Sequence, residues 1–143
     1  MIAALVDWLA ASGITAWASR GAVYPVANIA HLLGLVLLLG CIGIVDLRLL
    51  GAWRALPVDA LQRALTPLGI AGLVLLAMSG SVLFAADAGS LVGSTVFRWK
   101  LVVIGLALAN AALFRRFGGR LLAGLSLGAW LVVAALGRMI AYS

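Results

Sequence analysis

Four apolar runs, each close to 20 residues long, constrain the fold of this chain more than any other feature of its sequence. They cover about 24–49, 65–86, 97–114 and 121–142, with short links between them. A hydrocarbon core of about 30 Å is crossed by a helix of roughly 20 apolar residues. Lipid offers the backbone no hydrogen-bond partners, so such segments cross it as helices. The pattern predicts an all-α integral membrane four-helix bundle, with residues 1–143 forming a single domain.

Composition agrees with a membrane protein and argues against a nucleic-acid partner. Hydrophobic residues make up 66% of the chain and charged residues 10%, whereas a soluble domain is closer to half apolar and a quarter charged. The net charge of +6 comes from bases in short links and at helix ends, where topology signals lie. The expected partner is therefore the lipid bilayer. The single cysteine, Cys41, excludes an internal disulfide and suits close helix packing beside Gly40 and Gly43.

The first 20 residues are too short and too interrupted to span a membrane. Their apolar residues repeat at helical spacing with tryptophans nearby: Ile2, Leu5, Val6, Leu9, Trp8 and Trp17. This pattern predicts an amphipathic helix in the membrane interface, with its indoles at headgroup level. The first charge is acidic, Asp7, which is atypical of a cleaved signal peptide.

The basic residues predict the orientation of the bundle. Short links make successive helices antiparallel neighbours. Six arginines lie in or beside the first and third links: Arg48, Arg54, Arg63, Arg115, Arg116 and Arg120. The opposite side carries four bases: Arg20, Arg98, Lys100 and Arg138. The positive-inside rule then puts both arginine-bearing links in the cytoplasm and both termini outside.

Three ionisable residues from three different spans lie at one depth on the outer side. At 1.5 Å per residue, His31 lies roughly 7–8 Å below the boundary, Lys100 roughly 4–5 Å and Arg138 roughly 6 Å. Trp99 lies near that level, and Met78 lies somewhat deeper. We therefore expect these residues to border one site.

Two cations at one depth cannot neutralise each other, and an unpaired imidazole in lipid is costly. The spans offer no anion at that level except Asp87 at the rim. The site is therefore expected to bind a ligand with negative charge: a lipid headgroup, a quinone oxygen or the propionates of a haem. In the alternative interpretation, Lys100 and Arg138 extend their charged ends to water.

A second polar layer is predicted on the inner side. Asp46 and Arg48 end the first span, Thr66 opens the second, and Asn110 lies one turn from the end of the third. Buried acids in membranes are usually paired, so this layer is interpreted as an ion pair or a hydrogen-bonded cap. Proton entry from the cytoplasm is the functional alternative.

Several short motifs carry a family resemblance along nearly the whole chain. They are Tyr24-Pro25, His31-Leu32-Leu33-Gly34, Asp46-Leu47-Arg48-Leu49-Leu50-Gly51, Ser79-Gly80 with Leu83-Phe84, Phe97 with Lys100, Asn110, and Gly137-Arg138 with Ile140-Ala141-Tyr142. With these motifs the chain resembles a family of small bacterial four-helix membrane proteins of unknown function. It is more loosely similar to the membrane domain of copper-resistance proteins and to the membrane protoporphyrinogen oxidase of haem biosynthesis. The resemblance implies the bacterial inner membrane, with the termini on the periplasmic side.

The likeness to the oxidase implies that His31 is an axial haem ligand and that Lys100 contacts a propionate or the substrate. The chain has no second histidine, which multi-haem cytochromes need, and no Cys or Met cluster suited to copper. We therefore predict a b-type haem protein with a redox or electron-transfer role, whose redox partner the sequence does not identify.

The second axial position has several candidates. They are Met78, Met139, or His31 of a second subunit across a two-fold axis in a homodimer; the position can also be open. Lys100 and Arg138 would bind the propionates. Trp99 and Trp130 would flank the ring or serve in packing.

Other functions are kept as alternatives. They are a module that binds or transports a small anion, a quinone or a metal, and a structural subunit of a membrane complex. Hydrolysis is disfavoured, since no base can be placed beside Ser79, Ser81 or Ser126. Ser79-Gly80-Ser81 is interpreted as a helix-packing notch.

Overall fold

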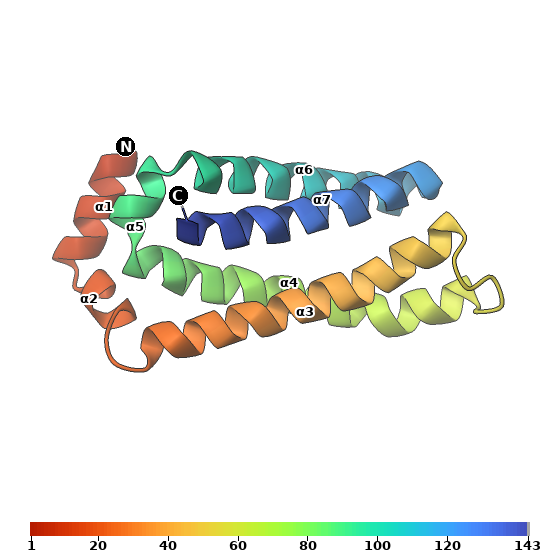
Figure 1. Ribbon diagram of the computed structural model, residues 1–143, viewed down its shortest axis with the longest axis horizontal. Coiled ribbons are helices and arrows are strands. Elements are labelled where there is room, and N and C mark those ends of the chain that lie inside the picture. Colours follow the sequence, from red (N-terminus) through yellow and green to blue (C-terminus); the bar gives the residue numbers. More distant parts are fainter. Residues whose placement is uncertain (143) are drawn as a thin grey trace.

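Four long helices run side by side along the length of the molecule (Figure 1). The computed structural model describes residues 1–142, and these contain no strand. The four helices are α3 (Val23–Leu50), α4 (Val58–Ala86), α6 (Thr95–Phe117) and α7 (Arg120–Met139), which continues into a 3-10 turn, η1 (Ile140–Tyr142). Each is long and apolar enough to cross a bilayer. The predicted all-α, multi-pass membrane bundle is confirmed.

The two ends of the bundle differ. One end carries both termini with the short helices, and the other carries the links 51–57 and 118–119 (Figure 1). We call these the terminal end and the loop end. The terminal end corresponds to the predicted outer side and the loop end to the predicted inner side. That the termini share one side is expected for an even number of spans.

The N-terminal segment forms two short helices rather than one. α1 (Ile2–Ala11) and α2 (Ile14–Ala18) are separated at Gly13, whose φ of 79° is left-handed. A third short helix, α5 (Ala88–Gly93), lies in the link between α4 and α6. A small core joins α1 and α2 to the end of α4 and to α5: Leu9, Ala18, Ala85 and Ala88. The three short helices thus cover the terminal end of the bundle (Figure 1).

The second span begins seven residues earlier than its apolar run. Pro57, with an extended ψ of 121°, precedes the first turn of α4, and Asp59 lies in that turn. Acidic residues favour a helix N-terminus because they complement the helix dipole. Pro67, which the start of the apolar run at residue 65 would put in the first turn of the helix, is therefore inside α4.

Helices α3 and α4 form the closest pair, because glycines face each other. A Cβ added at Gly72 would lie 2.7 Å from both the Gly34 carbonyl oxygen and the Leu38 amide nitrogen. Small residues at such contacts let backbones approach in lipid, where apolar burial does not drive association. Gly34 and Gly72 therefore set the distance between the two helices.

The second pair is α6 with α7, and the two pairs meet mainly where α3 packs on α7. Their shared core contains Leu38, Ala107, Trp130 and Val133. Trp130 is buried here, which favours its packing role. In contrast, α4 and α6 barely contact each other. Most large apolar side chains lie on the outside of the bundle, where lipid is their solvent.

Candidate functional site

The terminal half of the bundle holds the only histidine in a defined hydrogen bond. His31 lies on α3, half-buried, with Nδ1 3.0 Å from the Ser79 hydroxyl oxygen on α4. Its ring lies on Gly80, where an added Cβ would come within 3.2 Å of Cε1. The Ser79-Gly80 notch therefore accommodates an aromatic side chain as well as helix packing.

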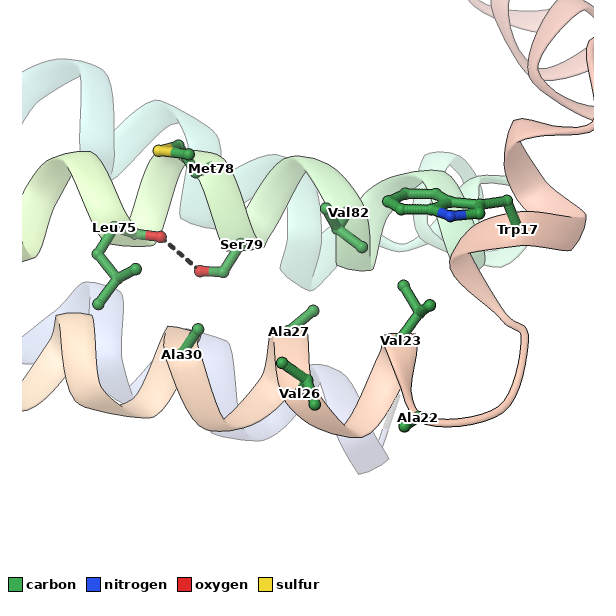
Figure 2. A pocket seen from close by; sticks show the side chains of 10 residues that line it. All are labelled: Trp17, Ala22, Val23, Val26, Ala27, Ala30, Leu75, Met78, Ser79 and Val82. Carbon is green, nitrogen blue, oxygen red and sulfur yellow. Dashed lines mark hydrogen bonds between the residues drawn. The ribbon is translucent and has the colours of Figure 1, made fainter.

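The bonds around Ser79 determine which ring nitrogen is free. The Ser79 hydroxyl donates to the carbonyl oxygen of Leu75 at 2.6 Å, as Figure 2 shows. Having used its hydrogen there, the hydroxyl can only accept from His31. The hydrogen-bond network therefore assigns the ring hydrogen to Nδ1 and leaves the lone pair on Nε2. A histidine oriented in this way is ready to bind a metal through Nε2.

Lys100, on α6, lies in the same terminal half of the bundle as this histidine and is half-buried. Its ammonium nitrogen lies 3.4 Å from the point where a Cβ on Gly137 of α7 would stand. Lys100 makes no hydrogen bond or ion pair with any other residue in the described part of the chain. The structure thus places His31 and Lys100 in one half of the bundle, on two different helix pairs.

The remaining predicted site residues do not join this pair. Arg138 is exposed; its guanidinium donates to the Tyr142 hydroxyl at 2.8 Å and lies over that ring. Trp99 is 60% exposed and lies beside Arg98 in a shallow depression on the outside of α6. Met78 is 66% exposed. These three side chains lie at nearly the same depth as His31 and Lys100 but face other directions.

Met78 borders a separate feature, an apolar groove of about 500 Å³ between α3 and α4. Figure 2 shows Ser79 pointing toward α3 while Met78 points away, and Trp17 of α2 closing the terminal end of the groove. His31 is not among the lining residues. The groove that Met78 borders therefore does not include the histidine.

The loop half of the bundle holds a second set of buried polar residues. Asp46 on α3 is 4% exposed, and the Ser126 hydroxyl of α7 lies within hydrogen-bonding reach of its carboxyl group. The other carboxyl oxygen, Oδ2, is buried without a partner. Asn110 on α6 donates to the Leu122 carbonyl oxygen of α7 at 2.9 Å. This layer joins helices, as the cap interpretation predicted.

The predicted pairing of Asp46 with Arg48 does not occur. Arg48 instead donates to the carbonyl oxygens of Leu56, at 2.7 Å, and Arg54, at 3.0 Å. Residues two positions apart on a helix point in directions about 200° apart. The side chains of Asp46 and Arg48 therefore lie on opposite sides of α3. Thr66 is half-buried on α4 and takes no part in these bonds.

Two serines were missed as polar partners. Ser79 lies seven residues before the end of α4, and His31 lies eight residues after the start of α3, so both have the same depth at the terminal end. Ser126 and Asp46 match in the same way at the loop end, six residues into α7 and four residues before the end of α3. Counting depth from shared helix ends would have indicated both pairs.

Comparisons with known proteins identified no protein similar to this chain. No family model matches the sequence, and no match was found among curated proteins or solved structures. The described residues also contain no group of three or more His, Cys, Asp or Glu side chains placed to hold a metal ion. The family resemblance of the motifs therefore stays a prediction, and function must be argued from the side chains themselves.

Proposed function

We propose that this chain is a membrane haem b protein, with His31 as the axial ligand in the terminal half of the bundle. One observation carries the proposal: the His31–Ser79 bond, which leaves Nε2 with a free lone pair. Haem iron is commonly held by a single proximal histidine whose other ring nitrogen donates to a nearby acceptor. Bound haem would supply one-electron chemistry or a binding position for a small gas.

Lys100 is the proposed propionate partner. It comes from the opposite helix pair and makes no bond of its own within the described residues. An ammonium in this setting favours an anionic oxygen, and charge-assisted bonds of this kind are strong. Arg138 lies one residue beyond Gly137 but is turned to Tyr142 at the rim. It is therefore a weaker candidate for the second propionate.

The residues present fit one axial position for each chain. Met78 is 66% exposed beside a groove that His31 does not line, and Met139, at the end of α7, is 55% exposed, so both are dropped as the second ligand. That leaves an open position or His31 of a second copy in a homodimer, the two alternatives that require no further ligand from this chain. A planar group entering between α4 and α6 would displace few helix contacts.

The test is the absorption spectrum of protein purified from haem-replete cells. We expect a Soret band that survives washing and is lost in His31→Ala. Lys100→Gln should bind haem about tenfold more weakly, the effect of losing one charge-assisted bond of about 1.5 kcal/mol. Arg98→Gln, on the same helix and exposed, is the matched control and should not change the affinity.

Ser79→Ala tests the positioning role of the serine. It should shift the midpoint potential of the bound haem and weaken binding at least tenfold, because second-shell bonds to a ligating histidine have effects of this size. A colourless protein that gains no Soret band when haem is added would overturn the proposal.

A quinone site is the second candidate, because the apolar groove borders Ser79 (Figure 2). A groove of about 500 Å³ lined by apolar side chains suits an isoprenoid tail. Solvent extraction of the purified protein separates the two functions. Quinone in the extract of a colourless protein would favour the groove.

For the membrane and the topology, we propose the bacterial inner membrane with both termini on the periplasmic side. Arginines crowd the loop end, which the positive-inside rule assigns to the cytoplasm. Reporter fusions at the C-terminus and in the link 51–57 should give opposite signals. The reverse pattern would invert the assignment.

A further inference from the structure

The loop end of α3 gathers guanidinium groups that have no acidic partner among residues 1–142. Gly51 ends this helix in a left-handed conformation, with φ of 117°, and its amide donates to the Arg48 carbonyl oxygen. Arg120, at the start of α7, donates from Nη2 to the Leu50 carbonyl oxygen at 2.5 Å. The last carbonyl groups of a helix attract cations, which explains why Arg120 of α7 binds the C-terminal end of α3.

A second guanidinium converges on the same place. Arg120 Nη2 lies 3.3 Å, and Arg54 Nη2 4.0 Å, from the point where a Cβ on Gly51 would stand. Arg48 orients this arrangement, since it binds the Arg54 carbonyl oxygen and so holds the link 51–57 against the helix. Glycine at position 51 leaves the space between the two guanidinium groups free of a side chain.

No carboxylate of the described residues neutralises Arg54 or Arg120. Asp46 is buried against Ser126, and Asp59 is exposed without an ion pair. The Arg54 side chain donates no hydrogen bond within the described part of the chain. Two like charges held together in this way lower their energy by sharing an anion.

The residues beside Arg54 in the link 51–57 favour an anion that also carries apolar groups. Trp53 has a positive φ of 45°, a conformation that bulky residues rarely adopt, and it is 54% exposed. Leu56 on the same link is 44% exposed. Exposed tryptophan at the end of spanning helices is typical of the headgroup layer. The link that carries Arg54 therefore also carries two exposed apolar side chains.

We propose that Arg54 and Arg120 bind the phosphate of an anionic membrane lipid, with Trp53 and Leu56 against its glycerol and upper acyl chains. Guanidinium binds phosphate in a bidentate way, and basic pockets between helix ends bind anionic headgroups. A free phosphate would use the same guanidinium groups but would have no contact with the apolar side chains.

The experiment titrates the detergent-solubilised full chain with phosphatidylglycerol and, separately, with phosphatidylcholine. Binding is counted by native mass spectrometry. We expect tighter binding of phosphatidylglycerol in the wild type, and about fivefold weaker binding in each of Arg54→Gln and Arg120→Gln. One basic residue near a membrane surface has an effect of this size. Arg115→Gln is the matched control: the same end, exposed, and outside the cluster.

Three outcomes would overturn the proposal. The first is an equal loss of phosphatidylglycerol binding in Arg115→Gln, which would mean general attraction to a basic surface. The second is competition by millimolar inorganic phosphate, which would assign the site to free phosphate. The third is unchanged binding in Arg54→Gln, whose side chain makes no hydrogen bond that folding requires.

Discussion

The polar residues at the two ends of the bundle are held very differently. At the loop end, Asn110 bonds to α7 and Arg120 bonds to α3, so side chains connect neighbouring helices. At the terminal end, His31 also bonds across helices, to Ser79 on α4, but that bond uses only one ring nitrogen, and Lys100 bonds to none of the described residues. Bonds between helices in lipid stabilise a fold, whereas half-buried groups without partners indicate a binding site.

This contrast distinguishes the buried polar residues of the loop end, which mainly connect helices, from the half-buried ones of the terminal end. Among the described residues of the loop-end layer, Asp46 Oδ2 is the one buried side-chain polar atom without a hydrogen-bond partner. The terminal-end layer leaves an imidazole nitrogen and an ammonium available for a ligand. The variants that follow test this division, beginning with the one that should cost most stability.

Gly72→Leu should disrupt the terminal-end site by forcing α3 and α4 apart. The new Cβ would overlap backbone atoms of Gly34 and Leu38 at 2.7 Å, and backbone cannot move aside as a side chain can. We expect a loss of about 3 kcal/mol in the free energy of unfolding, at the upper end for overpacking. Denaturant titration in detergent measures it.

Gly105→Leu is the matched control for that variant, because an added Cβ there meets nothing within 4 Å. Its stability should stay within about 0.5 kcal/mol of wild type. Equal losses in both variants would show that the α3–α4 contact is not specific.

Asn110→Leu should cost more stability than Ser79→Ala, if the loop-end layer is structural. Asn110 is 8% exposed and joins α6 to α7, so its loss should cost about 1–2 kcal/mol. Ser79→Ala should cost less than about 1 kcal/mol, since His31 is only half-buried. Asn28→Leu, an exposed asparagine on α3, is the control and should be neutral. The reverse ranking of the two variants, again by unfolding in detergent, would contradict the division.

The four spans could be predicted because lipid selects for apolar length, which is visible in the sequence. The first seven residues of α4, 58–64, were missed because Asp59, Gln62 and Arg63 interrupt the apolar run, although the helix continues through them beyond the hydrocarbon. The break at Gly13 also escaped, since the apolar repeat of α1 ends before it. Apolar length therefore predicts the membrane-embedded part of each helix and leaves its ends undetermined.

The candidate site could be predicted only in part, because the position of a side chain depends on its depth in the membrane and also on the direction in which it faces around the helix. His31 and Lys100 were placed at one level, and both are half-buried in the structure. Arg138, Met78 and Trp99 share nearly the same level but face the rim or the lipid. Each residue turns a helix by about 100°, so the facing direction depends on how neighbouring helices are rotated, which a single sequence does not contain.

Asp46→Asn should raise stability by about 1 kcal/mol at neutral pH. The carboxyl group is 4% exposed, and its Oδ2 has no partner, whereas the amide has the same shape without the charge. Its oxygen can still accept from Ser126. Asp59→Asn, exposed in the first turn of α4, is the control. A loss above about 2 kcal/mol in Asp46→Asn would mean that the carboxylate has a charged partner in the membrane.

The smallest effects are expected for Met78 and Trp99, which lie near the depth of His31 but face the lipid. Met78→Leu and Trp99→Phe should each change the free energy of unfolding by less than about 0.5 kcal/mol, because both side chains are exposed to lipid and both replacements are apolar. Neither should alter the absorption spectrum of haem-loaded protein, whereas His31→Ala should abolish it. A spectral change in Met78→Leu alone would require sulfur to reach the iron from the groove between α3 and α4. It would therefore contradict the exclusion of Met78 as a ligand, which rests on its exposure and on the absence of His31 from the groove lining, and on which the proposed single axial ligand depends.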